Sequence, residues 1–313
     1  MYYPYFRGKQ NELIAIRELS QLIAESNFVP IIEPVKEQLS GLIRALDSLR
    51  DAGAEAIVVV NPKHGDLRRR NDPILELLRT RYSAYERFYV GVLLDANMEI
   101  GDFPRLREPI VTHSIALIHC GFMSASSLAE EVRDDASIST SVFLESDILY
   151  RRHFAFHQNR ILLKDGFTKR SRNSDHPNRE FFSSLHLTYH EEGATGFGDF
   201  QIVGDEYSES GGPAYTVAIH LTYIDDDDDS KMYVRHFKSD RQDTPTDPGG
   251  KFLEALTKLI QYLDGPDCKI YETEAIGEFR ALHARTHFPG LGSVKKLSMK
   301  HHIETFSWFF GED

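Results

Sequence analysis

The sequence predicts an α/β fold, a (β/α)8 barrel of the TIM type, with a β-hairpin inserted after the eighth strand and a C-terminal helical extension. Short apolar runs that end on a polar residue alternate with amphipathic stretches along most of the 313 residues. About eight such units occur, which is enough to close a barrel. An open doubly wound sheet is the alternative, but no Gly-x-Gly-x-x-Gly turn follows an early strand.

The apolar runs and the helical spacing of the stretches between them set the expected elements. We expect strands at residues 2–6, 28–35, 56–60, 88–94, 114–119, 141–144, 160–163 and 197–203. We expect helices at residues 10–25, 39–51, 73–85, 126–134, 148–158, 179–190 and 251–263. The helix after the fourth strand should be short or broken, because Pro104 and Pro109 lie in that segment.

The pattern changes after the eighth strand. Residues 215–238 alternate in polarity around an acidic run at 225–229, which predicts an antiparallel hairpin. A turn near Asp228 would place His220 opposite His236, with both rings on one face. We divide the chain into a barrel over residues 1–277, which includes this hairpin, and a helical extension over residues 278–313 that packs on the barrel.

Composition narrows the class of protein. The formal net charge is −12, which disfavours nucleic acid and anionic membranes as partners unless a local basic patch exists. The two cysteines exclude a disulfide framework and a Cys-rich zinc site. Neither a basic leader followed by an apolar stretch nor an apolar run of roughly 20 residues occurs. We therefore expect a cytoplasmic protein that has no membrane partner.

Polar groups directly end several of the apolar runs, and the C-terminal ends of barrel strands meet at one mouth. A carboxylate in that position is partly desolvated unless a cation or metal pairs with it. The candidate catalytic residues are Glu33, Asp95, Glu145 and Asp199 at the mouth, with His220 and His236 on the hairpin. The candidate ligand-binding residues are Arg7, Lys9, Asn61, Lys63, Lys164 and Asp165. The alternative is that loops after strands are polar by default.

Two basic clusters suggest an anionic ligand. Lys63 and Arg68 to Arg70 follow the third strand, and Lys164 with Lys169, Arg170 and Arg172 follows the seventh. At one rim they would suit a phosphate or a nucleotide, although no Walker motif is present. They could equally pair with nearby aspartates as solvated charges. A divalent metal held by the carboxylates or by the histidine pair is a further option, and ordinary cross-strand packing is the alternative for that pair.

Three segments resemble a known family. They are Tyr3-Pro4-Tyr5-Phe6-Arg7-Gly8-Lys9-Gln10 with Glu12, then Pro30-Ile31-Ile32-Glu33-Pro34, and Gly198-Asp199-Phe200. These are similar to the "protein beta" family of bacterial and phage genomes. The resemblance implies a barrel of unassigned activity with a role in conflicts with phages and mobile elements, and it carries over Lys9, Glu12, Glu33 and Asp199. The hairpin histidines lie outside the family pattern.

Two hypotheses follow. The first is an enzyme, a hydrolase-like component of an anti-phage or mobile-element system that acts on a phosphate-containing ligand. The second is a non-catalytic sensor or scaffold that binds a ligand or phage protein and docks a partner effector such as a nuclease. Both leave homo-oligomerisation open, and neither specifies a cofactor.

Overall fold

The computed structural model describes residues 1–68, 70, 72–209, 211–212 and 214–311. Its contacts divide the chain into two compact units. The barrel unit comprises Met1–Lys164 and Leu185–Asp199, and the second unit comprises Asp165–Ser184 and Phe200–Asp313. The hairpin and the helix expected at residues 251–263 therefore group with the C-terminal helices, whereas the sequence pattern places them with the barrel.

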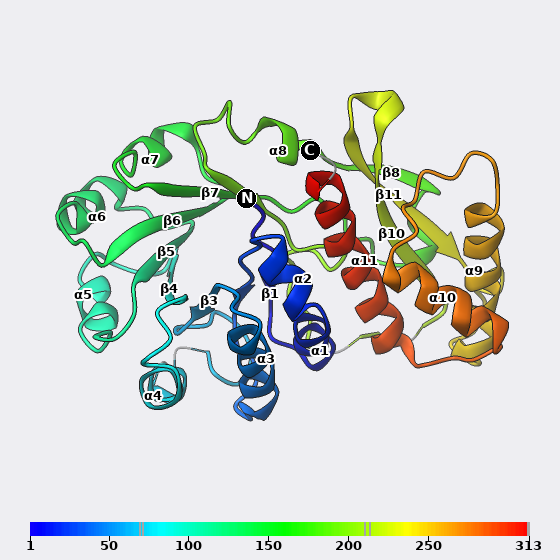
Figure 1. Cartoon of the computed structure of the whole chain (residues 1–313), viewed down its shortest axis with the longest axis horizontal. Helices are drawn as coiled ribbons and strands as arrows, with labels where there is room; N and C mark the ends of the chain where they lie inside the picture. The colour runs from blue at the N-terminus through cyan, green and yellow to red at the C-terminus, as the bar shows by residue number, and fades with distance from the viewer. Residues whose placement is uncertain (69, 71, 210, 213, 312–313) are drawn as a thin grey trace. The chain divides into compact units, whose positions relative to one another are not determined.

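Eight parallel strands form the barrel in the order β1-β2-β3-β4-β5-β6-β7-β9 (Figure 1). They are β1 (Tyr5–Phe6), β2 (Ile31–Ile32), β3 (Ala56–Val59), β4 (Phe88–Asp95), β5 (Ile115–Cys120), β6 (Ile138–Leu144), β7 (Asn159–Leu163) and β9 (Gly196–Gly198). Every neighbouring pair in this order is parallel. This confirms the predicted TIM-type barrel.

The barrel closes between its N-terminal segment and β9. Tyr2 forms a parallel bridge with Phe197, and the Tyr3 amide donates to the Phe197 carbonyl at 2.8 Å. Gly198 makes this approach possible, because a Cβ there would lie 2.1 Å from the carbonyl oxygen of Tyr3. The expected eighth strand is thus present, but it is shorter than predicted and ends before Asp199.

Helices follow the strands of the barrel unit. They are α1 (Gln10–Glu18), α2 (Ser20–Glu25), α3 (Ser40–Asp51), α4 (Asp72–Arg81), α5 (Asp102–Arg107), α6 (Ala125–Val132), α7 (Ile148–Arg152) and α8 (Leu185–Thr188). In α3 the buried residues Leu42, Ala45, Leu46 and Leu49 share one face, as helical spacing requires. The proline-bearing segment gives only the six-residue α5, as predicted.

A three-stranded antiparallel sheet, in the order β10-β11-β8, forms the second unit's framework. Its strands are β10 (Ala218–Asp225), β11 (Lys231–Lys238) and β8 (Arg179–Ser183). The hairpin register is the predicted one, because His220 pairs with His236 and Tyr223 with Tyr233. The prediction of a helix over residues 179–190 is wrong at its start, where β8 pairs with β11 instead.

Helices cover this sheet through an apolar core of the second unit. They are α9 (Pro248–Leu263), α10 (Glu274–Ala284) and α11 (Leu291–Gly311). Ile219, Leu221 and Phe252 are fully buried within that core. His301 and His302 of α11 bond to Thr222 of β10 at 2.9 and 2.8 Å, so the C-terminal helix is tied to the hairpin. No helix in the described part of the chain is long and apolar enough to cross a membrane.

Candidate functional site at the barrel mouth

The four strand-end carboxylates share one end of the barrel. Glu33 follows β2, Asp95 ends β4, Glu145 follows β6 and Asp199 follows β9. Because these strands are all parallel, their carboxyl ends lie on the same side, as the sequence pattern predicts. The surroundings of the four groups nevertheless differ, and those surroundings decide what each can do.

Glu33 is fully buried, and both of its carboxylate oxygens accept hydrogen bonds. Its Oε2 accepts hydrogen bonds from the Tyr5 hydroxyl at 2.8 Å and from Arg7 Nη1 at 2.6 Å. Its Oε1 accepts from the Lys63 backbone amide at 2.7 Å. Burial, together with the Glu33 charge, raises the pKa of Tyr5 well above its ordinary value, so the phenol stays a donor. Glu33 therefore joins β1, β2 and the loop after β3.

Three other predicted site residues also bond to the protein itself. Asp199 is buried and accepts the Tyr2 hydroxyl at 2.7 Å. The Asn61 amide donates to the Leu93 carbonyl at 2.7 Å and accepts from the Leu93 amide at 2.8 Å. This pair of bonds prolongs the ladder between β3 and β4 beyond the last residue of β3. Asp165 belongs to the second unit, where its carboxylate accepts backbone amides at 2.9 and 2.7 Å.

Three predicted residues lie at the ends of barrel elements. Lys164 is exposed directly after β7, and Lys9 is half-buried at the residue preceding α1. Glu145 is exposed and has a φ of +45°, the left-handed region that non-glycine residues rarely adopt. Such local strain at a strand end is common at functional sites. The position of Glu145 is thus consistent with a role at the mouth.

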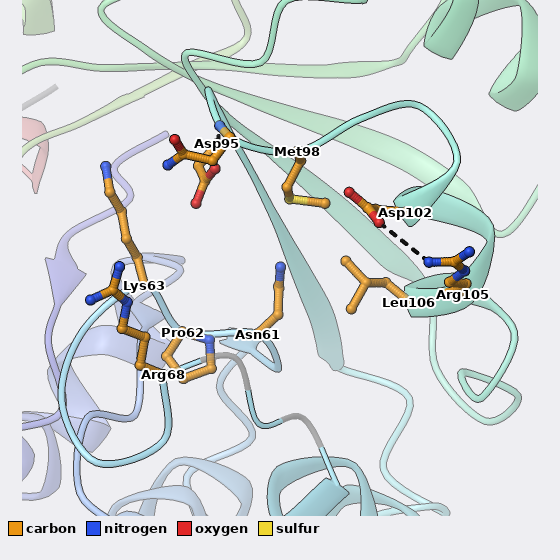
Figure 2. A pocket seen from close by; sticks show the side chains of 10 residues that line it. Asn61, Pro62, Lys63, Arg68, Asp95, Met98, Asp102, Arg105 and Leu106 are labelled. Carbon is orange, nitrogen blue, oxygen red and sulfur yellow. Dashed lines mark hydrogen bonds and ion pairs between the residues drawn. The ribbon is translucent and has the colours of Figure 1, made fainter.

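A cavity of about 460 Å³ opens where β3 and β4 end (Figure 2). Its lining is Asn61, Pro62, Lys63, Arg68, Asp95, Asn97, Met98, Asp102, Arg105 and Leu106. Figure 2 shows Lys63 and Arg68 on one side and Arg105 on the other. Lys63 and Asp95, both predicted as site residues from their places after strands, therefore meet in one pocket. We call it the mouth pocket.

The barrel unit has a second cavity of about 660 Å³. Residues of α1 and α3 contribute to its lining, and none of the four strand-end carboxylates does. The mouth pocket is smaller, but it contains Asp95 and lies where barrel proteins place their ligands.

The positive charges of the mouth pocket are only weakly neutralised by carboxylates. Within the described ranges, no carboxylate forms an ion pair with Lys63 or Arg68, and Lys63 Nζ lies 3.7 Å from the Cys120 sulfur. Arg105 pairs with Asp102 at 3.7 Å, and both of those side chains are exposed. The pocket therefore offers positive charge to a ligand.

Most of the remaining basic residues pair with carboxylates. Arg70 pairs with Glu37 at 3.0 Å, and Arg69 lies outside the described residues. Three of the four residues in the basic cluster after β7 are also paired, because Lys169 lies 2.9 Å from Glu206, Arg172 lies 3.4 Å from Asp175, and Arg170 contacts Glu180. Part of each cluster, Lys63 and Arg68 in the first and Lys164 in the second, forms no ion pair with a carboxylate within the described residues.

Sequence reasoning missed a buried polar chain inside the barrel unit. His119 bonds to the Tyr150 hydroxyl at 2.9 Å and to Ser141 Oγ at 3.1 Å, and Ser141 Oγ lies 2.7 Å from His157 Nδ1. Burial lowers the pKa of His119 to about 3 and that of His157 to about 4. Both rings are therefore neutral near pH 7. His157 belongs to no recognisable strand end, so no local signal marks it.

The hairpin histidines lie side by side, as predicted. Their Nδ1 atoms are 2.6 Å apart. Burial lowers the pKa of His236 to about 3 and that of His220 well below its usual value. Glu180 and His176 lie beside His236, and both belong to the second unit. Glu180 was not predicted as a site residue, because the sequence of its segment predicts a helix.

Comparisons with known proteins add little. No family model matches the chain, and no curated protein matches it. Among solved structures, the chain is similar to FabK from Thermotoga maritima with a TM-score of 0.36 and to a mutant of that protein with a TM-score of 0.37. Each is 11% identical, over 99% of this chain and 96% of that chain. Likeness at this level carries no argument, so the barrel assignment depends on the strand order and pairing.

Proposed function

We propose that the mouth pocket binds a small anionic ligand that contains a phosphate group. One observation carries the proposal: Lys63 and Arg68 line a cavity of about 460 Å³ at the strand ends, and no carboxylate in the described part of the chain pairs with either. The volume is within the range of small-molecule sites. A guanidinium group can bind two phosphate oxygens at once, and an ammonium group adds a second charge.

The loop that carries both cations is held in place before any ligand arrives. The Lys63 backbone amide is fixed by Glu33, and the Asp66 amide donates to the Val35 carbonyl at 2.8 Å. Gly65 allows the loop to approach Val35, because its φ is +73° and a Cβ there would lie 2.1 Å from the Val35 carbonyl oxygen. A preorganised loop loses less entropy when a ligand binds.

Carboxylates in the same pocket extend the proposal to hydrolase-like chemistry. Asp95 accepts the Asn97 amide at 2.7 Å through Oδ1, and Asp102 lies across the pocket (Figure 2). A carboxylate beside a bound phosphate can activate water or hold a divalent cation with the ligand. The resemblance to the "protein beta" family supports placing this activity in an anti-phage or mobile-element system.

Binding tests this proposal directly. Inorganic phosphate and a nucleoside triphosphate are titrated into the full chain by calorimetry. Lys63→Gln and Arg68→Gln should each weaken binding by at least about 10-fold, because each removes a charge-assisted hydrogen bond. Arg70→Gln is the matched control, since Arg70 lies in the same segment but pairs with Glu37. Pocket variants that bind as tightly as the control would overturn the proposal.

A measurement of catalytic turnover distinguishes an enzyme from a non-catalytic sensor. Phosphate release from a phosphomonoester and from a nucleoside triphosphate is measured with Mg²⁺ or Mn²⁺, for the unaltered chain and for Asp95→Asn. Release that falls in Asp95→Asn supports the hydrolase-like activity. Tight binding without release at any metal concentration would reject it and favour the non-catalytic sensor.

A further inference from the structure

Three potential metal ligands converge in the second unit. They are His176, which follows the short 3-10 helix η1 (Asn173–Asp175), Glu180 of β8 and His236 of β11. One nitrogen or oxygen atom from each lies within 4.8 Å of the others. It is the one such group of three that the described residues contain.

One side-chain atom of each residue in this cluster has no hydrogen-bond partner. These atoms are Nδ1 of His176, Oε2 of Glu180 and Nε2 of His236, and all three are buried. Nε2 of His236 and Oε2 of Glu180 are 3.7 Å apart, which is too long for a hydrogen bond. Both histidines are only 3% exposed. Buried polar atoms are normally satisfied, so three unsatisfied atoms in one cluster point to a position where an ion can bind.

The outer side-chain atoms of Glu180 and His236 are occupied. Arg170 donates to Oε1 of Glu180, and His220 shares a hydrogen bond with Nδ1 of His236 at 2.6 Å. His176 is held through its backbone, because its carbonyl oxygen accepts from Lys238 Nζ. In metal sites the outer atoms of the ligands are held by protein groups in this way, which orients the inner atoms.

We propose that His176, Glu180 and His236 bind a divalent transition-metal ion. Imidazole nitrogens suit Zn²⁺, Fe²⁺, Ni²⁺ and Cu²⁺, whereas Mg²⁺ and Ca²⁺ prefer sites made of oxygen atoms. Ligand atoms on a tetrahedral zinc ion, at about 2.1 Å from it, are roughly 3.4 Å apart. The Glu180–His236 separation of 3.7 Å is close to this value, and the three ligand atoms all lie within 4.8 Å of one another, so the side chains draw together when the ion binds.

The proposal assigns a role to the fourth residue, His220. Coordination through Nε2 of His236 places the proton of that ring on Nδ1, which then donates to Nδ1 of His220. His220 is therefore a positioning residue. Two histidines and one carboxylate leave at least one coordination position for water, as in zinc sites that do chemistry. The Phe167 ring, 5.2 Å from the His220 ring and 5.5 Å from the His176 ring, forms an apolar wall.

The test uses the full chain after treatment with a chelator, titrated with Zn²⁺ alone. We expect one equivalent of Zn²⁺ per chain, together with visible absorption bands when Co²⁺ replaces it, and no binding of Mg²⁺ at the same site. Glu180→Gln and His236→Ala should lose tight binding, and His220→Ala should weaken it by about 10- to 100-fold. His287→Ala, an exposed histidine of the same unit, is the matched control and should bind as the unaltered chain does.

Glu180→Gln makes the test independent of folding defects, because it keeps the shape of the side chain and Glu180 is only partly buried. Circular dichroism and melting of the metal-free variants identify any that fail to fold, and those are then set aside in favour of Glu180→Gln. The absence of stoichiometric Zn²⁺ binding at micromolar concentrations would overturn the proposal. So would a folded Glu180→Gln variant that binds Zn²⁺ as tightly as the unaltered chain.

Discussion

The Glu33→Gln variant should unfold far more easily than the unaltered chain, although Glu33 occupies a strand end where catalytic groups are expected. The Arg7 side chain is 8% exposed and that of Glu33 is 0% exposed, and they are 2.6 Å apart. Glu33→Gln removes the buried carboxylate that lies 2.6 Å from the Arg7 guanidinium. Removing one partner of such a pair costs about 3–5 kcal/mol. A double variant, Arg7→Met with Glu33→Gln, removes both charges and should lose less stability than the single one.

Urea unfolding at pH 7, followed by circular dichroism, measures this difference in the free energy of unfolding. Glu37→Gln is the control, because its partner Arg70 is exposed and surface pairs contribute within about 1 kcal/mol. A loss below about 1 kcal/mol for Glu33→Gln would refute the reasoning. It would mean that the Glu33 charge does not hold the mouth together and is free for chemistry.

Two further predictions concern the barrel unit. The pKa of His119 in the folded chain is about 3, against an ordinary 6.5, so the unfolded chain binds the proton first as the pH falls below 6.5. Acidification from pH 7 to 5 should therefore lower the free energy of unfolding by about 2 kcal/mol through this group. His119→Gln should remove that part of the pH dependence. Equal losses of unfolding free energy in the variant and the unaltered chain would contradict the prediction. Asn61→Ala removes both bonds to Leu93 and should lower the unfolding free energy by about 1–3 kcal/mol, whereas an unchanged urea midpoint would count against that role.

The barrel could be predicted from sequence because its signals are local. Each apolar run and the polar residue that ends it can be recognised within a few positions, and the parallel pairing follows from the alternation with helices. The hairpin register was equally accessible, since the acidic turn and the alternating polarity of residues 215–238 define it. Both elements appear in the structure with the expected pairing.

The β8 strand was not predictable in the same way. Residues 179–183 pair with β11, some fifty residues later in the chain, and nothing within the segment itself indicates that partner. Because Glu180 was placed on a helix, its approach to His236 could not be foreseen. The two units are also discontinuous in sequence, so a single boundary near residue 277 could not describe them.

At the mouth, sequence located the polar groups but not their partners. Glu33 and Asp95 both end apolar strands, yet one is enclosed by Tyr5 and Arg7 and the other lines a pocket. Side-chain direction and packing decide this difference, and neither can be derived from spacing. The same limit applies to Arg68, which lines the pocket while nearby Arg70 pairs on the surface.

The most direct measurement is a crystal structure of the full chain grown with inorganic phosphate at a concentration that saturates binding in solution. We expect the anion in the mouth pocket, with its oxygens within about 4 Å of Lys63 Nζ and of the Arg68 guanidinium. Phosphate bound elsewhere on the chain, with the mouth pocket empty under those conditions, would contradict the proposed function.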